Sequence, residues 1–486
     1  GMKDMKKALS FLALTGLSLS LAGCGGQTAG SETNTSTNSE APSTQQESTT
    51  SEKITLTIGT HHVCGDNPKS PKVGTEGCMS IEEAEYKSAI VDQIEEEYGI
   101  TFEFYEYQSE DKIEEITGWN LAGTSEADIV RLNADEYTSL VKSGNLADIT
   151  NYVDKVSKEV DVFGNDLPYR LGVVGSSNYG VARDNMIYPE LLVFDVNILE
   201  DAGMEEMPNE LWQKGEWTFD TAREYFKKVQ QYADSSSELT YAFGTDSFYI
   251  FKAALAANGV KLIENGESNV NSEAVYETMS YLETLRNDGV LNIYAVPYAA
   301  DDTKFKYALT DMKNLFGAAQ SAWEKGTPDQ EVAEKDKGGV AFTLLDAWRS
   351  DCCIRNSDKE YGVVPFPENS SDAFVPAGRG DMYAIPISVS EDKLEIITKA
   401  MALFTSVHTK PTAVQEWSER NFPTQDDAVE IVQYLQDKGE IDPYTDYSGG
   451  YDWSYTSFVN EWFVDPTTLT THLETLDGII KSNLSK

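Results

Sequence analysis

The sequence predicts an α/β fold made of at least two lobes, and three observations lead to this prediction. The chain has 486 residues, about three times the size of a usual domain of roughly 150 residues. Hydrophobic residues make up 40% of the chain and aromatic residues 11%, which is enough to fill large cores. Beyond residue 52, stretches with a strand pattern alternate with stretches with a helix pattern, as in α/β proteins.

Residues 1–23 have the pattern of a secretory signal. Three lysines precede an apolar stretch from Ala8 to Ala22, which is too short for a comfortable membrane span. The stretch ends in Leu21-Ala22-Gly23-Cys24, which resembles the lipobox of bacterial lipoproteins. This resemblance implies that Cys24 becomes the first mature residue and carries a lipid that anchors the protein to a membrane. An ordinary signal peptide followed by a chance cysteine is the alternative.

Residues 24–52 predict a disordered tether. They are almost entirely Ser, Thr, Gly, Gln, Asn and Glu, without an aromatic residue or a periodic apolar face. Such a segment buries too little apolar surface to compensate for its ordering entropy. We therefore expect a flexible connection between the lipid anchor and the folded body.

The chain is strongly acidic. It contains 38 Lys and Arg residues against 81 Asp and Glu residues, a formal net charge of −43. A surface of this sign repels nucleic-acid phosphates and anionic lipid headgroups. We expect no nucleic-acid partner, and we interpret the charge as the solvated exterior of a soluble protein.

The first folded residues alternate between strand and helix. Residues 54–58 alternate apolar and polar side chains, which predicts a half-buried strand. A helix is predicted over residues 81–98, with Gly99 as its stop. Residues 100–104 alternate again and predict a second strand.

Further elements follow the same patterns. Residues 127–130 predict a short buried strand, and residues 137–141 predict a helix. Longer helices are predicted over residues 272–288 and 390–405. The last of these begins with Ser390 as its N-cap and two acids in its first turn, where the helix dipole favours negative charge.

Six phrases in order along the chain resemble a known family. They are Ala127-Asp128-Ile129-Val130 followed by Ser143-Gly144-Asn145-Leu146-Ala147-Asp148-Ile149; Leu192-Val193-Phe194-Asp195 followed by Ile198-Leu199 and Ala202-Gly203-Met204; Glu216-Trp217-Thr218-Phe219-Asp220; Gly339-Val340-Ala341-Phe342 with Trp348; Tyr361-Gly362-Val363-Val364-Pro365-Phe366-Pro367; and Asn421-Phe422-Pro423-Thr424. Together they resemble the extracellular sugar-binding proteins of ABC importers, the solute-binding family that includes maltose-binding protein. Residues 61–80 and 324–338 look like extra loops, and Phe194-Asp195 replaces the family's usual Tyr-Asn pair.

The resemblance implies the type II periplasmic-binding-protein-like fold, in which two α/β lobes joined by hinge strands close on a ligand. It implies chain crossings near residues 185–190, 374–384 and 417–421. One lobe would then contain residues 53–184 and 385–417. The other would contain residues 190–373 and 420–486.

A sugar site needs aromatic faces for the C–H surfaces of the ligand and planar polar groups for its hydroxyls. Trp348 occupies the position that the resemblance gives to a stacking tryptophan, although a core tryptophan is the alternative. The other candidates stand at strand ends, at the crossings or in the aromatic run near residue 453, where helix starts, salt-bridged turns and helix packing are the competing explanations. They are His61, Asn133, Asp135, Tyr188, Arg379, Asp381 and Trp453.

With Cys24 lipidated, four cysteines remain and allow three pairings. We expect Cys64 to pair with Cys78, which would clamp the first extra loop. Cys352 and Cys353 would then form a vicinal disulfide or stay as thiols. A metal site at His61, His62 and Cys64 is disfavoured because the chain has 4 histidines in total.

The sequence thus predicts a monomeric, extracellular or periplasmic sugar-binding lipoprotein that works with ABC transporter permease subunits, without a cofactor or metal. The chain contains no zinc-protease helix, phosphate-binding glycine loop, EF-hand spacing or nucleophile elbow, and we expect it not to be an enzyme. The alternatives are a binding protein for another solute, such as a peptide or a metal chelate, and a surface glycoside hydrolase. The identity of the ligand cannot be predicted from these patterns.

Overall fold

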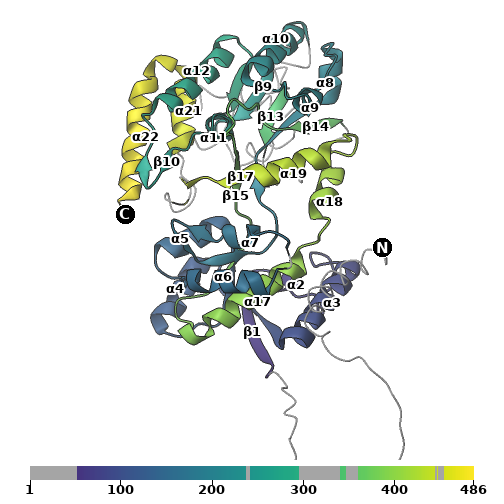
Figure 1. The fold of residues 1–486 in the computed structure, drawn as a ribbon, viewed down its shortest axis with the longest axis vertical. Coiled ribbons are helices and arrows are strands. Elements are labelled where there is room, and N and C mark those ends of the chain that lie inside the picture. Colours follow the sequence, from purple (N-terminus) through teal and green to yellow (C-terminus); the bar gives the residue numbers. More distant parts are fainter. Residues whose placement is uncertain are drawn as a thin grey trace, which may run out of the picture.

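The computed structural model describes residues 52–161, 163–236, 241–294, 340–345, 359–443, 446 and 454–485. These residues form two lobes, one above the other in Figure 1, and each lobe holds a five-stranded sheet flanked by helices. The two-lobe α/β arrangement expected from the sequence is confirmed. Within the described residues, no helix combines the length and the apolar character needed to cross a bilayer.

The sheet of the first lobe is mixed. Its strand order is β2-β1-β3-β16-β6. The first three strands run parallel, whereas β16 runs antiparallel to both β3 and β6. The strands are β1 (Ile54–Thr60), β2 (Ile100–Glu106), β3 (Ile129–Leu132), β6 (Gly180–Ala182) and β16 (Met382–Ala384).

Helices cover this sheet, and α17 is the most deeply buried of them. Phe404 of α17 lies between Phe102 and Tyr383, with ring centroids 4.8 and 5.7 Å apart. The helix α3 begins at Ser80, whose side chain accepts from the Glu83 amide, and it ends at Gly99 in the left-handed conformation. The elements of this lobe outside its sheet are α2 (Val63–Asp66), α3 (Ile81–Tyr98), α4 (Lys112–Ala122), α5 (Ala134–Lys142), α6 (Thr150–Glu159), α7 (Leu167–Arg170), β4 (Val173–Val174), β5 (Ser177–Asn178), η3 (Glu391–Lys393) and α17 (Leu394–His408).

The second lobe holds a sheet of order β12-β9-β13-β8-β14. The strands β12, β9 and β13 run parallel, and β8 runs antiparallel to β13 and β14. The strands are β8 (Leu191–Asp195), β9 (Tyr241–Asp246), β12 (Leu291–Tyr294), β13 (Val340–Leu345) and β14 (Tyr361–Val364).

An aromatic core holds the second lobe together. Trp217 is 3% exposed, stacks on Phe342, and donates its indole N–H to the Pro365 carbonyl at 3.0 Å. Phe226 also packs against Phe342, with the two rings nearly perpendicular and their centroids 5.0 Å apart. The remaining elements are α8 (Val196–Asp201), α9 (Pro208–Gln213), α10 (Phe219–Ser235), α11 (Ser247–Ala257), β10 (Ile263–Glu264), β11 (Glu267–Ser268), α12 (Glu273–Asn287), α18 (Ala413–Asn421), α19 (Ala428–Lys438), α21 (Ser454–Val464), η4 (Pro466–Thr468) and α22 (Leu469–Leu484).

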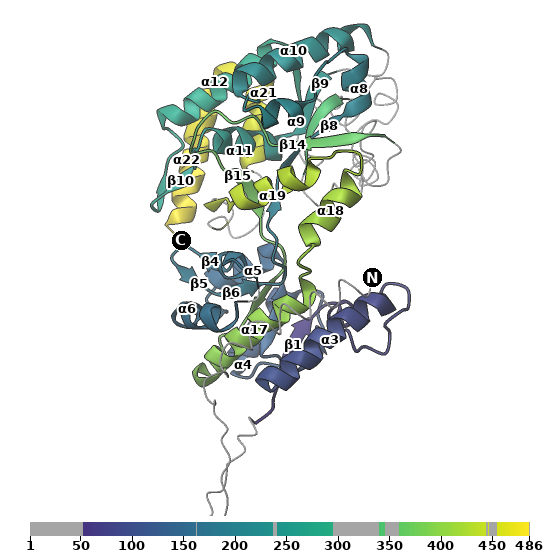
Figure 2. The same cartoon turned by 45° about the vertical axis from the view of Figure 1, so that its right-hand side comes forward.

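A small sheet of order β17-β15-β7 lies between the lobes. Its strands are β7 (Tyr188–Pro189), β15 (Val375–Gly378) and β17 (Gly439–Ile441). The chain passes between the lobes a third time after α17, and Figure 2 shows α18 rising from that point toward α19. Trp417 of α18 packs with Leu191 and Val193 of the second lobe. The third crossing therefore lies at residues 409–412, earlier than the expected position at residues 417–421.

Most of the predicted elements match the structure, and the differences are local: β3 begins two residues after the predicted strand, and α5 begins three residues before the predicted helix. Helices α3 and α12 lie where the periodicity predicts them, and Thr218 caps α10 through the Thr221 amide. The helix predicted from Ser390 instead begins with the 3-10 turn η3, and α17 runs from Leu394 to His408. The Ser390 hydroxyl is bonded to the Asp392 carboxylate rather than to a backbone amide, so it does not cap the helix.

Candidate ligand-binding site

One edge of the first sheet collects polar side chains from four strands. Leu132 at the end of β3 pairs with Met382 at the start of β16, which also pairs with Ala182 at the end of β6. The residues that follow β3 and β6 therefore lie beside the residues that precede β16. We call the side chains at this place the polar edge; its members are His61, Asp66, Arg131, Asn133, Asp135, Arg183 and Asp381.

The polar edge faces the second lobe. Two of the chain crossings, residues 185–190 and 374–381, leave or enter the first sheet at this edge. It also contains the carboxyl ends of the parallel strands β1 and β3. Ligands of open α/β sheets bind outside the carboxyl ends of the strands, so this edge is the best candidate for the site.

Two arginines and two aspartates form the centre of the polar edge. Arg131 donates from Nη1 to Asp66 Oδ2 at 2.8 Å and from Nε to Asp381 Oδ2 at 2.7 Å. Arg183 donates from Nε to the other oxygen of Asp66 at 3.1 Å. The Asp66 carboxylate is fully buried, whereas the side chains of Arg131 and Arg183 are 14% and 15% exposed. Both arginine side chains thus keep a small part of their surface open, while the buried Asp66 carboxylate bonds to both of them.

The charges in this network fix the ionisation of its members. Burial opposes ionisation of Asp66, but the guanidinium groups of Arg183 and Arg131 outweigh it and lower the pKa of Asp66 below its usual value. His408 is fully buried beside the network, and its Nδ1 lies 3.0 Å from Lys87 Nζ and 3.2 Å from Arg183 Nη2. Burial, followed by the charges of Arg183 and Lys87, holds the pKa of His408 well below its usual value. His408 is therefore neutral and accepts from both cations.

Three expected site residues from the strand ends lie on the exposed part of the polar edge. His61 follows β1 and is exposed. Partial burial of its ring, followed by the charges of Lys112 and Arg131, lowers the pKa of His61. Asn133 caps α5 by accepting from the Glu136 amide at 2.8 Å. Asp135 is exposed in the first turn of α5, and partial burial followed by the charge of Glu136 raises its pKa. The carboxylate of Asp135 is available to a ligand, whereas the side-chain oxygen of Asn133 is engaged by the helix.

Tyr188 and Asp381 lie where the crossings meet the first lobe. Tyr188 donates to Asp184 Oδ2 at 3.3 Å, and burial followed by the charge of Asp184 raises its pKa. Its ring lies against Gly380, where an added Cβ would come within 2.4 Å of Tyr188 Cε2. Asp381 is 27% exposed. The structure thus brings both residues into the neighbourhood predicted from the sequence.

Arg379, in contrast, is not placed to touch a ligand. Its side chain is 3% exposed. Its Nε donates to the Leu171 carbonyl and its Nη2 to the Val173 carbonyl, both at 2.7 Å, and Asp446 accepts from Nη1 and Nη2. The guanidinium also lies over the ring of Tyr137. This arrangement fastens the hinge strand β15 to the first lobe and to Asp446, so Arg379 acts as a structural tie.

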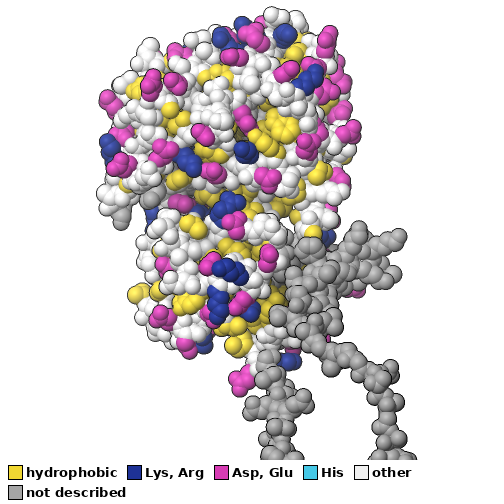
Figure 3. All heavy atoms as spheres, in the orientation of Figure 1, with side chains coloured by type: hydrophobic (Ala, Val, Ile, Leu, Met, Phe, Trp, Pro, Cys, Tyr) yellow, Lys and Arg dark blue, Asp and Glu magenta, His cyan; other side chains and the backbone are white. Residues whose placement is uncertain are grey.

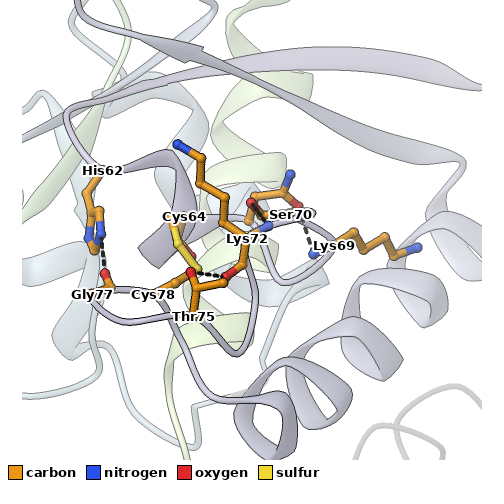
Figure 4. Close-up of a disulfide and its surroundings, with 9 residues drawn as sticks. His62, Cys64, Lys69, Ser70, Lys72, Thr75, Gly77 and Cys78 are labelled. Atoms are coloured by element: carbon orange, nitrogen blue, oxygen red, sulfur yellow. Dashed lines mark hydrogen bonds between the residues drawn. A yellow bond between two sulfur atoms is a disulfide. The ribbon is translucent and has the colours of Figure 1, made fainter.

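Several expected residues lie outside the described part of the chain. They are Cys24, Trp348, Trp453, Cys352 and Cys353. Cys64 and Cys78 are described, and they form a disulfide with Cα atoms 5.3 Å apart (Figure 4), which is the pairing expected from the sequence. In the same loop His62 Nε2 lies 2.9 Å from the Gly77 carbonyl oxygen. Among the described residues, no group of three or more His, Cys, Asp or Glu side chains is arranged to hold a metal ion.

Among the described residues, the cations of the polar edge and one lysine beside the hinge are paired with carboxylates. Besides the network of Arg131 and Arg183, Lys112 contacts Glu136 at 3.0 Å and Lys252 contacts Glu190 at 3.1 Å. On the face drawn in Figure 3, Lys and Arg side chains are interspersed with Asp and Glu at the junction between the lobes. A ligand with a net negative charge would have to compete with these carboxylates. The arrangement suits a neutral ligand whose hydroxyl groups use fixed donors and acceptors.

A separate pocket of about 460 Å³ lies at the hinge. It contains none of the residues of the polar edge. Its walls come from both lobes and from the first and third crossings, and they include Tyr86, Ile90, Phe163, Asn165, Leu167, Arg170, Asn185, Met186, Ser406, Thr409, Lys410, Pro411, Ala413, Val414, Gln433, Gln436 and Asp437. This pocket is an alternative location for a ligand among the described residues.

Asp66, Arg131 and Arg183 are not among the site residues expected from the sequence. A charged residue inside the apolar phrase Ile129-Val130-Arg131-Leu132 is a usable signal, because a buried strand carries an arginine only when it has a partner. Asp66 carries no such signal, since it lies in a loop without periodicity. Its partners are 65 and 117 residues away, and only the strand order brings them together.

Comparison with known proteins identifies the fold. No family model matches the chain, and no curated protein sequence matches it. Solved structures do match. The cyclic α-maltosyl-1,6-maltose binding protein of Arthrobacter globiformis is 14% identical with a TM-score of 0.57, covering 89% of this chain and 99% of that one. The sugar-binding protein MalE of Xanthomonas citri is 13% identical with a TM-score of 0.56, covering 89% and 98%.

UgpB of Mycobacterium tuberculosis in complex with glycerophosphocholine is also similar. It is 13% identical with a TM-score of 0.52, covering 89% of this chain and 99% of that one. At these identities the likeness concerns the fold. The chain therefore has the two-lobe fold of periplasmic binding proteins, over nearly the whole length of each of these structures.

Proposed function

We propose that this protein is the solute-binding component of an ABC importer and that it binds a neutral carbohydrate between its lobes at the polar edge. The observation that carries the proposal is the charge-matched network of Arg131, Arg183, Asp66 and Asp381 at the sheet edge facing the second lobe. The shared fold with two sugar-binding proteins supports it, because such folds place ligands between the lobes. The fold alone does not determine the function, because one fold serves many functions.

Each part of the polar edge has a role in the proposed binding. The open parts of Arg131 and Arg183 donate to ligand hydroxyls, while Asp135 and Asp381 accept from them. Trp348 and Trp453 are proposed to supply the apolar faces on which the sugar ring stacks. Because the cations at the edge are already neutralised, we propose an uncharged oligosaccharide rather than an acidic or phosphorylated one.

Binding is proposed to close the two lobes on the ligand. The first lobe would comprise residues 53–184 and 382–408, and the second residues 190–373 and 413–485. The three crossings between them would bend, as in hinged binding proteins. The closed form would be the one presented to the permease subunits, and the binding protein would act as a monomer.

The N-terminal segment is proposed to anchor the protein to the outer face of the cell membrane. A lipid on Cys24 would provide the anchor, and residues 25–52 would act as the leash that lets the folded body reach the permease. This part of the proposal rests on the sequence pattern of residues 1–24. It is tested by mass spectrometry of the protein from its native host, where an unmodified cysteine or a different mature N-terminus would contradict it.

A thermal-shift screen of neutral oligosaccharides tests the ligand class. A sugar at 100 times its dissociation constant stabilises the folded protein by about 2.7 kcal/mol. Each hit is then titrated calorimetrically into Asp381→Asn, which weakens two charge-assisted hydrogen bonds from Arg131. We expect a loss of affinity of about 1.5–3 kcal/mol. Asp288→Asn, which alters an Arg-paired aspartate of the second lobe, is the matched control and should bind normally.

Other outcomes would redirect the proposal. If no sugar stabilises the protein but a peptide or a metal chelate does, the carbohydrate assignment is wrong. If a hit is cleaved, as followed by chromatography of the products, the protein is a glycoside hydrolase instead. If affinity falls in Arg170→Ala of the hinge pocket and not in Asp381→Asn, the ligand lies in that pocket.

A further inference from the structure

A disulfide-clamped segment delivers a buried carboxylate to the polar edge. Residues 61–80 connect β1 to α3, and the disulfide between Cys64 and Cys78 closes most of this segment into a loop (Figure 4). Within it only Asp66, Pro68 and Met79 are buried. A segment with so few buried residues gains little from apolar contact. The covalent closure and a few local hydrogen bonds therefore determine its shape.

Asp66 is the point at which this segment enters the lobe. Its Oδ2 accepts from Arg131 at 2.8 Å and from the Thr60 hydroxyl, and its Oδ1 accepts from Arg183 at 3.1 Å. One carboxylate thus uses both oxygens to hold two guanidinium groups. The other carboxylates that contact these arginines, Asp381 and Asp184, are 27% and 24% exposed, whereas Asp66 is shielded from water completely.

Arg131 and Arg183 need such a shared counter-ion. Each carries a positive charge, they come from neighbouring parts of one sheet edge, and their mutual repulsion opposes a fixed arrangement. A planar guanidinium recognises a ligand only when its direction is fixed. Since Asp66 bonds to both groups, it sets the direction in which each presents its remaining donors.

We propose that Asp66 is the positioning residue of the ligand site, and that the Cys64–Cys78 disulfide keeps it there. The part of this inference that concerns affinity rests on the proposed function; the part that concerns the arginines does not. Without the Asp66 charge or the disulfide, Arg131 and Arg183 become mobile and accessible before the first lobe unfolds. Ligand affinity falls with them, because the binding groups are no longer held in place before the ligand arrives.

Arginine labelling with phenylglyoxal, quantified by peptide mass spectrometry, tests the positioning without a ligand. In the unaltered protein, Arg131 and Arg183 should react more slowly than Arg170, whose side chain is 48% exposed. In Asp66→Asn, and separately in Cys64→Ser with Cys78→Ser, both should react at least fivefold faster. Arg379, held by Asp446 and two carbonyls, is the internal control and should not change.

The second measurement is affinity for whichever neutral oligosaccharide binds the unaltered protein. Asp66→Asn and the double serine variant should bind at least tenfold more weakly at a temperature where both remain folded, while Asp288→Asn binds normally. Unchanged labelling of Arg131 and Arg183 in both variants, or an equal rise at Arg379, would overturn the inference. Faster labelling with unchanged affinity would overturn the role of Asp66 in binding. If no oligosaccharide binds, the proposed function fails, and the labelling alone still decides whether Asp66 positions the arginines.

Discussion

Replacement of Arg379 by methionine separates a structural tie from a ligand contact. The side chain is 3% exposed and donates to Leu171 and Val173 carbonyls and to both oxygens of Asp446. The substitution leaves the Asp446 carboxylate, which is 12% exposed, without its cation. Loss of one partner of a buried ion pair costs about 3–5 kcal/mol. We therefore expect Arg379→Met to lower the free energy of unfolding by about this amount.

The assay is urea-induced unfolding followed by circular dichroism, with two comparisons. Arg223→Met removes an arginine that also pairs with an aspartate but is 37% exposed, and it should cost about 1 kcal/mol or less. Arg379→Met combined with Asp446→Leu should recover much of the loss, because no unpaired charge is left buried. A loss below about 1 kcal/mol in Arg379→Met, together with weakened ligand binding, would refute the structural role and restore the ligand contact expected from the sequence.

Three further predictions follow from individual contacts. Burial opposes ionisation of Asp66, but Arg183 and Arg131 outweigh it and lower the pKa of Asp66 in the folded protein. The charge of Asp66 therefore stabilises the fold when the pH is above the pKa of an aspartate in the unfolded chain, about 3.9. The stability difference between the unaltered protein and Asp66→Asn should stay constant from about pH 5 to 7 and shrink as the pH falls below about 4; a difference that grows in acid would contradict this. Gly380→Ala should cost about 1–3 kcal/mol and weaken ligand binding, because its Cβ would come within 2.4 Å of the Tyr188 ring, whereas Gly378→Ala meets nothing within 4 Å and should be neutral; equal effects of the two on thermal melting would count against it. Trp217→Ala removes the centre of the aromatic core of the second lobe and should lower the free energy of unfolding in urea by about 3–5 kcal/mol. The labelling rates of Arg131 and Arg183 should not change. A loss below about 1 kcal/mol would show that the core repacks.

Much of the fold follows from local patterns in the sequence. The helix α3 has its N-cap Ser80 and its stop at Gly99 written in the chain, and the alternation of residues 54–58 identifies β1. The family resemblance placed the third crossing near residues 417–421, and it does not say which lobe receives the apolar face of α18. That choice depends on Leu191 and Val193, more than 200 residues earlier.

The candidate site was predicted only in its outline. Positions at strand ends led to His61 and Asp135, because the carboxyl ends of strands meet at one edge, and the second expected crossing led to Asp381. Arg379, two residues from Asp381, has the same sequence context, but its side chain is 3% exposed and is held by Asp446 and two backbone carbonyls, whereas Asp381 is 27% exposed. Partners such as Asp66 and Arg183 depend on the strand order of the sheet, which a single sequence does not reveal.

Hydrogen exchange with and without a bound oligosaccharide tests the central claim most directly. The measurement is made on the full chain, and it compares backbone protection at the polar edge with protection at the hinge pocket. We predict slower exchange in residues 129–136 and 181–184 when the sugar is present, with residues 163–170 and 433–437 of the hinge pocket changing less. Protection confined to the hinge pocket, or no oligosaccharide that changes exchange anywhere, would contradict the account.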